Sequence, residues 1–301
     1  MAESYHVPVL LEPALEGLAI KEGGVYVDVT FGGGGHSRAI LERLSSEGRL
    51  LGFDQDPDAL SNTLKDDRFT LIHQNFKFMK NHLRLEGVTQ VDGILADLGV
   101  SSHQFDTAER GFSTRYDAEL DMRMDQARVL RAKDVINTYS EADLHFLFGR
   151  YGEVQNAKTL AKLLCNARAM KPINSVLELK EVIKDIVPRG REHKYFAQLF
   201  QALRIEVNDE LEALKILLEQ SSELLKPGGR LVVISYHSLE DRLVKAYMQK
   251  GRFRGEVEKD FYGNEIKPFR MISRKALVAS ATEIERNNRA RSAKLRVAEK
   301  I

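Results

Sequence analysis

The sequence has almost no cysteine and no long hydrophobic run, and each absence excludes a class of protein. Cys165 is the single cysteine of 301 residues, so neither an internal disulfide nor a cysteine metal cluster can form. No apolar run is long enough to span a bilayer. Residues 1–6 lack the basic and then apolar pattern of a signal peptide. We therefore expect a protein of the reducing cytoplasm that has no membrane partner.

The net charge is also small, at +1, so any binding to nucleic acid must come from local patches. One candidate is the stretch 286–301, where six Lys and Arg side chains stand against Glu299 alone. This stretch is either a solvated basic tail or a binding patch, and the sequence favours neither. Arg189, Arg191 and Lys194 form a second basic group.

Residues 25–97 alternate short apolar runs with helical stretches. We expect buried strands at 25–29, 50–54, 69–72 and 93–97, and a helix over 37–44. Strands that alternate with helices predict a parallel, doubly wound sheet.

From about Phe105 the pattern becomes helical. Ser140 with Asp143, and Ser175 with Glu178, have the spacing of capping boxes that begin helices. No segment in this part of the chain is as strand-like as those of the first third.

The sheet pattern then returns, with a long helix expected over 207–225 and a strand over 230–235. We predict an α/β fold: a Rossmann-like sheet domain formed by residues 1–104 and 206–301, interrupted by an all-helical domain of residues 105–205. The insertion follows the fourth strand, where the carboxyl ends of a doubly wound sheet form a ligand crevice. It is therefore expected to overhang the site.

Four consecutive glycines, Gly32–Gly35, follow the first predicted strand. Glycine lets the backbone approach a ligand closely, and the next helix points its first amides at that ligand. A tight strand-to-helix turn without a ligand is the alternative. Four glycines in a row cost backbone entropy, which argues against a purely structural turn.

Acidic residues end two of the later strands. Asp54 is placed to accept hydrogen bonds from two ribose hydroxyls. Asp56 is the competing candidate, but it precedes Pro57 and suits a helix N-cap better. Phe76 follows the third strand and lies either against an adenine face or in the ordinary core. Asp97 ends the fourth strand, near the place of a cofactor amine or a substrate.

These features fit two nucleotide-dependent chemistries. An NAD-type oxidoreductase would have Gly-x-Gly-x-x-Gly, in which Gly32 and Gly34 fit but Ser37 takes the place of the third glycine. A methyltransferase that uses S-adenosylmethionine tolerates that change, and it uses an acid such as Asp97. The residues favour the methyltransferase.

Longer motifs extend over most of the chain. They are Thr30–Ser37 (TFGGGGHS), Asp97–Ser102 (DLGVSS), Glu109–Ser113 (ERGFS), Leu120–Asp125 (LDMRMD), Ser235–Arg242 (SYHSLEDR) and Ala290–Arg296 (ARSAKLR). Together, in this order, they resemble the ribosomal RNA small subunit methyltransferase H family, also called MraW. The likeness begins at His6–Leu11 and covers nearly the whole chain.

The resemblance implies a class I methyltransferase fold with S-adenosylmethionine as methyl donor. It implies N4-methylation of a cytidine in the decoding region of bacterial 16S ribosomal RNA. The implied partners are 16S ribosomal RNA and the small ribosomal subunit, and a homodimer is compatible with the sequence. The implied cofactor contacts are Gly34, Gly35, His36, Asp54, Phe76, Asp97 and Gln104.

The chain departs from the family pattern at two places. His103, beside Gln104, stands where the family commonly has proline. The region 261–271 is shorter than in some relatives, and the sequence assigns no RNA contact to it.

The chemistry of the implied substrate limits what catalysis needs. The exocyclic amine of cytosine is a poor nucleophile because its lone pair is delocalised, so in-line positioning matters more than a strong base. The base must be exposed or flipped, and then held by stacking and edge hydrogen bonds. Many amino-methyltransferases have Asp/Asn/Ser-Pro-Pro-aromatic after the fourth strand, but Asp97–Val100 lacks the prolines and the ring. Phe112, Tyr116 and Tyr236 are the candidates to supply that ring.

Asp97, Tyr236 and His237 are the predicted catalytic residues. Asp97 would anchor the cofactor or the amine, and Tyr236 with His237 would line the cytosine pocket. The alternative for the following residues is structural, because Ser238 and Asp241 have capping-box spacing.

No metal is expected, because the histidines are scattered and form no pair at ligand spacing on a helix. The segment Asp121–Asp125 is interpreted as a salt-bridged, packed segment. A ribosome assembly factor that keeps an inherited fold is the alternative that has no enzyme activity.

Overall fold

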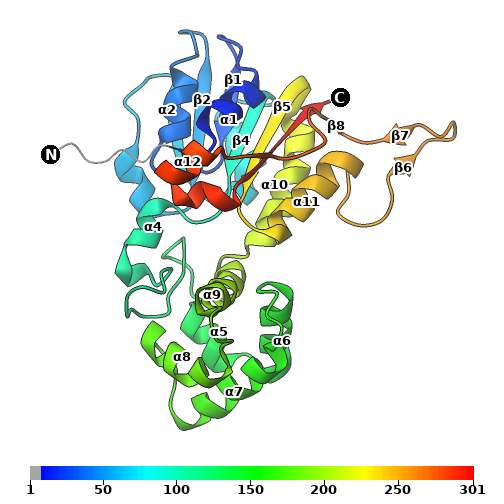
Figure 1. The fold of residues 1–301 in the computed structure, drawn as a ribbon. Coiled ribbons are helices and arrows are strands. Elements are labelled where there is room, and N and C mark those ends of the chain that lie inside the picture. The colour runs from blue at the N-terminus through cyan, green and yellow to red at the C-terminus, as the bar shows by residue number, and fades with distance from the viewer. Residues whose placement is uncertain (1–7) are drawn as a thin grey trace. The chain divides into compact units, whose positions relative to one another are not determined.

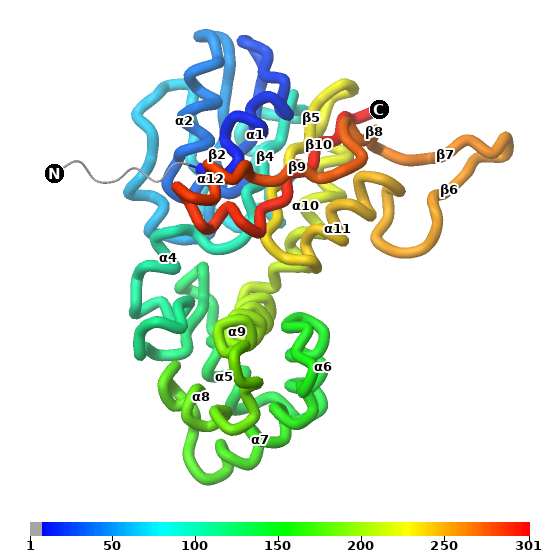
Figure 2. The backbone as a smooth tube through the Cα atoms, in the orientation of Figure 1, coloured from blue at the N-terminus to red at the C-terminus, as the bar shows by residue number. Residues whose placement is uncertain are grey.

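A computed structural model, drawn in Figures 1 and 2, describes residues 8–301. The N-terminal residues considered for a signal peptide, and His6 at the start of the resemblance, lie outside this range. The described chain forms two compact units, one of residues 8–99 and Leu211–Ile301 and the other of Val100–Glu210. We call them the sheet unit and the helical unit. Among residues 8–301, no helix is both long and apolar enough to cross a bilayer.

The sheet unit is built on one mixed sheet with the strand order β3-β2-β1-β4-β5-β10-β8, and β9 pairs with β10. Strands β1 to β5 are mutually parallel, whereas the last three are antiparallel additions. The strands are β1 Val25–Asp28, β2 Arg49–Asp54, β3 Phe69–His73, β4 Val91–Asp97, β5 Leu225–Ser235, β8 Phe269–Met271, β9 Leu277–Val278 and β10 Lys294–Lys300. This parallel core confirms the predicted Rossmann-like fold class.

Successive side chains of the central strands pack on opposite faces of the sheet. Val27 and Val233 belong to the cluster that includes α3, α10 and α11, while Tyr26 and Val232 belong to the cluster that includes α1 and α2. Both faces are therefore buried, which explains the continuous apolar runs of the sequence. The helices are α1 Leu11–Leu18, α2 Gly35–Leu41, α3 Met79–Leu85, α10 Glu210–Leu224, α11 Ser238–Lys250 and α12 Ala281–Arg286.

The strand order determines where a ligand crevice lies in the sheet unit. The chain winds outward through β1, β2 and β3 and then returns to place β4 on the other side of β1. Ligands of doubly wound sheets bind at the carboxyl ends of the strands at this reversal. The glycine loop follows β1, and Asp97 is the last residue of β4. The fold thus brings these two sequence features to the same edge of the sheet.

For most of its length the stretch 286–301 is neither the solvated tail nor the binding patch that the sequence left open. Residues 294–300 form β10, which pairs antiparallel with β5. Leu295 and Val297 are buried in the core. Arg296 is buried as well, because its guanidinium pairs with Asp241 at 2.6 Å. Of the cations at 286–301, Arg286 and Arg291 are exposed.

The helix predicted over 207–225 is interrupted. Helix α9 (Glu192–Asn208) is followed by its C-cap Asp209, whose φ of 56° is left-handed, and α10 then begins at Glu210. The two units separate close to this break and after Gly99. The sequence predicts boundaries at 104/105 and 205/206 instead. The structure differs because Ser101 already caps α4 and because 205/206 falls inside α9.

The helical unit has its own core, which includes Phe112, Phe148 and Leu203. Its helices are α4 Ser102–Asp106, α5 Ala132–Thr138, α6 Glu141–Arg150, α7 Ala157–Met170, α8 Val176–Ile183 and α9. The predicted starts of two helices are confirmed, since Ser140 caps α6 and Ser175 caps α8. The Asp121–Asp125 segment is salt-bridged and packed as predicted: Arg123 pairs with Asp121 at 2.7 Å, and both methionines are buried.

A small antiparallel hairpin of β6 (Glu258–Lys259) and β7 (Glu265–Ile266) follows α11. Figures 1 and 2 show it extending away from the rest of the sheet unit.

Candidate active site and cofactor cradle

The glycine loop has two kinds of glycine. Gly34 has a left-handed φ of 74°, and a β-carbon there would lie 2.9 Å from the Phe31 ring. A β-carbon at Gly35 would lie 2.3 Å from Pro8. A β-carbon at Gly33 would meet nothing within 4 Å. Packing within the protein therefore explains why positions 34 and 35, both predicted cofactor contacts, are occupied by glycine. Gly33, which was not predicted, presents the open side of the loop.

Asp28 ties the loop to the sheet. Its carboxylate accepts hydrogen bonds from the Ser37 hydroxyl at 2.7 Å and from the Thr30 amide at 3.1 Å. Burial raises the pKa of Asp28, and the two hydrogen bonds oppose that rise. Ser37, which breaks the dinucleotide fingerprint, is thus a partner of this acid. Sequence reasoning missed Asp28 as a site residue, although the available signal was the same as for Asp54, an acid that ends a buried strand.

Asp54 holds the other side of the loop. Its carboxylate accepts from the Gly32 amide at 2.7 Å and from the Asp56 amide at 2.8 Å. Burial raises the pKa of Asp54 to about 6. Asp56 caps the 3₁₀ turn that begins at Pro57, as predicted. Each carboxylate oxygen can accept more than one hydrogen bond, so Asp54 keeps acceptor capacity for a ribose.

Phe76 follows β3 in a short 3₁₀ turn and is half-buried. It packs against the core cluster of the α3 face and still has part of its surface exposed. This position is compatible with either of the two predicted roles.

Asp97 and Tyr236 are brought together by β4 and β5. The Tyr236 hydroxyl donates a hydrogen bond of 2.7 Å to Asp97 Oδ1. The tyrosine ring lies against Gly99, where a β-carbon would be 3.4 Å from the ring. Burial raises the pKa of Asp97 to about 6, and it also raises the pKa of Tyr236. Tyr236 therefore fixes one oxygen of this carboxylate.

His36 faces the other oxygen. Its Nδ1 lies 3.8 Å from Asp97 Oδ2. Burial lowers the pKa of His36, and the neighbouring Asp97 opposes that shift. The buried His36 Nε2 has no hydrogen-bond partner among residues 8–301. Asp97 thus stands between His36 of α2 and Tyr236 after β5, and the unpartnered nitrogen of His36 is the one other than that facing Asp97.

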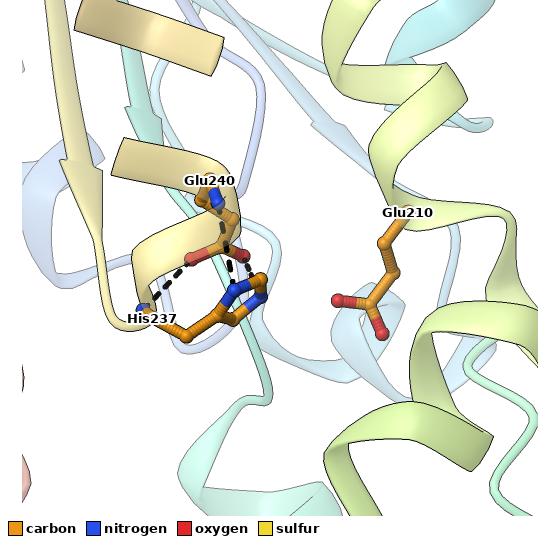
Figure 3. Close-up of side chains that lie close together, drawn as sticks. All are labelled: Glu210, His237 and Glu240. Carbon is orange, nitrogen blue, oxygen red and sulfur yellow. Dashed lines mark hydrogen bonds and ion pairs between the residues drawn. The ribbon is translucent and has the colours of Figure 1, made fainter. Parts of the chain in front are cut away.

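His237 is the N-cap residue of helix α11, as Figure 3 shows together with Glu240. The His237 ring accepts from the Glu240 amide, and Glu240 accepts from the backbone amides of Tyr236 and His237. His237 Nε2 also lies 3.1 Å from the Glu240 carboxylate. The capping box is therefore His237 with Glu240. The structural alternative, a box of Ser238 with Asp241, is wrong by one residue.

Glu240 is a buried acid that sequence reasoning did not single out. The available signal was its position three residues after His237. Histidine is an unusual helix cap, however, and Ser238 with Asp241 matches the usual capping-box sequence better.

The remaining predicted residues belong to the helical unit. Gln104 completes the capping box of α4, where its side chain accepts from the Ser101 amide at 3.0 Å. Phe112 is buried in the helical core, whereas Tyr116 has an exposed ring. The structure therefore gives Gln104 and Phe112 structural roles within their own unit.

The sheet unit fits the predicted cofactor. Gly33 offers backbone without a side chain above it, Asp54 offers acceptors, and His36 offers an unused buried nitrogen. Asp54 lies at the carboxyl end of β2, Gly33 lies in the loop that follows β1, and His36 lies in the first turn of α2, directly after that loop.

Comparison with known proteins agrees with this interpretation. Residues 3–301 match the MraW methylase family. A ribosomal RNA small subunit methyltransferase H from Cytophaga hutchinsonii is 62% identical over 98% of this chain and 99% of its own length. The proteins of the same name from Flavobacterium johnsoniae and Bacteroides thetaiotaomicron are 60% and 55% identical, each over 99% of this chain and 98% of its own length. The chain belongs to the MraW methylase family, which confirms the predictions of family, methyltransferase activity and S-adenosylmethionine as cofactor.

Proposed function

We propose that this protein methylates N4 of a cytidine in the decoding region of bacterial 16S ribosomal RNA. The relatives carry the name of a ribosomal RNA small subunit methyltransferase, and that name supports the RNA substrate. The observation that supports the chemistry is the Asp97–Tyr236 hydrogen bond at the carboxyl ends of β4 and β5, beside His36 in the first turn of α2.

We assign the cofactor to the loop after β1 and to the ends of β2 and β4. Asp54 would accept hydrogen bonds from the ribose, and Phe76 would lie by the adenine. S-adenosylmethionine supplies an electrophilic methyl group when bound. The contribution of the protein is position, because a weak nucleophile aligned with an electrophile gains most from fixed geometry.

Asp97 is the acceptor for the cytosine amine in this proposal. Tyr236 donates to Oδ1, and we assign Oδ2 to accept a hydrogen bond from the amine. That bond orients the amine and localises its lone pair. With a pKa of about 6, Asp97 is largely ionised at neutral pH and can take the proton that the methylated nitrogen sheds. We also assign His237 to the pocket wall, in addition to its capping role.

The helical unit is assigned to RNA recognition. Arg189, Arg191 and Lys194 are exposed at the start of α9, where they can contact phosphates without reading sequence. Location in the cytoplasm and formation of a homodimer stay predictions.

Mass spectrometry of ribosomal RNA nucleosides tests the proposal. Cells that lack the protein are expected to lose N4-methylcytidine from 16S RNA, and expression of the wild type is expected to restore it. Asp97→Ala is expected to fail, while Tyr236→Phe, which keeps the ring, is expected to lower kcat more than it changes KM. If N4-methylcytidine is unchanged without the protein, the proposal is wrong.

The same strains test the assembly-factor alternative. That alternative requires Asp97→Ala to restore subunit assembly and to leave RNA methylation at the wild-type level. A residue that binds the amine cannot satisfy the second condition.

A further inference from the structure

The tip of the β6–β7 hairpin displays two aromatic rings. Phe261 is 98% exposed and Tyr262 is 85% exposed. Their ring centroids lie 5.6 Å apart with an interplanar angle of 87°. The two ring faces therefore point in different directions, and neither contributes to a core.

The turn that carries the rings is held in a fixed shape. Asp260 accepts hydrogen bonds from the amides of Tyr262 and Asn264 and from the Asn264 side chain. The Asp260 backbone also bonds to Asn264 and Gly263. Gly263 has a φ of 87°, a conformation that suits glycine. The rings are thus presented by an ordered turn, so binding through them costs little additional ordering.

The base of the hairpin is anchored to the sheet unit. Phe253 stacks on Tyr247 of α11, with ring centroids 4.9 Å apart, and packs against the core. Arg252 forms an ion pair with Glu258, which links the start of the arm to β6. The arm is therefore a supported projection.

The size of the tip limits what it can bind. Two aromatic side chains bury about 300–500 Å² when covered, whereas a stable protein interface needs about 800 Å² from each partner. The residues beside the rings in the sequence are Asp260, Gly263 and Asn264, which are not the packed apolar neighbours typical of protein hot spots. Ring faces of this area match one or two nucleobases, which stack on aromatic side chains in single-stranded RNA.

The charge of the arm limits the kind of contact. Residues 252–267 hold equal numbers of basic and acidic side chains. An arm without net charge adds little overall attraction to the phosphate backbone. Contact of the two tip rings with RNA is therefore expected to be to bases and to respond weakly to salt.

We propose that Phe261 and Tyr262 bind unpaired bases of the RNA substrate by stacking. This inference rests on the proposed function, because it takes RNA as the substrate. Sequence alone assigned no RNA contact to the region 261–271. The exposure and geometry of the two rings are the reasons to assign one now.

A fluorescence titration tests the stacking directly. The chain has no tryptophan, so Tyr262→Trp introduces a single reporter that keeps an aromatic face at the tip. Unmethylated 16S ribosomal RNA is expected to quench it, since stacked bases quench tryptophan. Leu85→Trp, at an exposed position at the end of α3, is the matched control and is expected to change little. An unquenched Tyr262→Trp protein that still binds the RNA would overturn the proposal.

A second variant separates stacking from general apolar contact. Phe261→Leu/Tyr262→Leu keeps apolar surface but removes both ring faces. Affinity for naked 16S RNA is expected to fall about fivefold to a hundredfold for each stacked base, while the dependence of affinity on salt stays as in the wild type. Because both positions are exposed, an unchanged melting temperature is the check on folding.

The remaining outcomes are decisive as well. If the leucine variant binds naked RNA as the wild type does and loses affinity only for assembled subunits, the tip contacts a protein and the proposal is wrong. If the wild type itself neither binds nor methylates RNA, the proposed function fails.

Discussion

Asp97→Asn is expected to abolish methylation and, at neutral pH, to stabilise the protein. The wild-type carboxyl is buried between Tyr236 and His36, and burial raises its pKa from 3.8 to about 6. An amide of the same shape still accepts the Tyr236 hydrogen bond but carries no charge. It therefore avoids the cost of a buried ion, and it cannot take up a proton from the amine.

The pKa of Asp97 sets the size of the stabilisation. Each pKa unit corresponds to about 1.4 kcal/mol, so the ionised carboxyl costs the folded state about 3 kcal/mol above pH 6. A carboxyl whose pKa is raised by folding binds its proton more tightly in the folded than in the unfolded state. The wild type therefore recovers stability as the pH falls. About half of the cost remains at pH 5, and it disappears below a pH of about 4.

Unfolding in urea at pH 8 and at pH 5 measures this effect. The free energy of unfolding of Asp97→Asn is expected to exceed that of the wild type by up to about 3 kcal/mol at pH 8, and by about half as much at pH 5. Asp66→Asn is the control with the opposite sign, because the Arg68 side chain lowers the pKa of Asp66 to about 2. The reasoning would be refuted if Asp97→Asn were less stable than the wild type at pH 8, or if the difference in their free energies of unfolding were the same at both pH values.

Three other features are tested by separate substitutions. Gly34→Ala is expected to cost about 1–2 kcal/mol through backbone strain, seen as a lower melting temperature. Gly33→Ala is expected to leave stability nearly unchanged but to weaken S-adenosylmethionine binding in calorimetry, and equal effects of the two would contradict the proposed open side of the loop. Asp241→Ala leaves Arg296 buried without its carboxylate and is expected to cost about 3–5 kcal/mol in urea unfolding, so a loss below about 1 kcal/mol would show that the pair does not matter. His237→Asn keeps a good helix cap and is expected to lower kcat about tenfold at unchanged stability, whereas an unchanged kcat would limit His237 to capping.

The first four strands could be predicted because their sequences carry strong local signals. Each is a short apolar run between polar turns, and β2 and β4 both end in an acid. Since parallel strands put their carboxyl ends at one edge, the sequence alone is enough to place Asp54 and Asp97 together. The cap residues Ser140 and Ser175 were predictable for the same reason, because capping is a local property.

Features that depend on distant partners could not be predicted. In the sequence, strand β10 looks like a charged tail, because the residue that neutralises Arg296 is Asp241, which lies 55 residues earlier. The Tyr236 hydroxyl reaches Asp97 across 139 residues, so the tyrosine looked like a free stacking ring. The break at Asp209 requires a left-handed backbone at a residue that is not glycine, which no local pattern indicated.

The insertion between β4 and β5 has a consequence for how quickly the enzyme becomes active after synthesis. Asp97 pairs with Ile234 in the sheet, so the two central strands meet only after a very long loop closes, at an entropic cost that grows with loop length. The helical unit has its own core and mostly short-range helices, a composition that folds fast. Early folding of this unit would shorten the loop that remains to be closed. During refolding, helical circular dichroism is therefore expected to appear before S-adenosylmethionine binding, because the Asp97–Tyr236 contact can form only in the last stage.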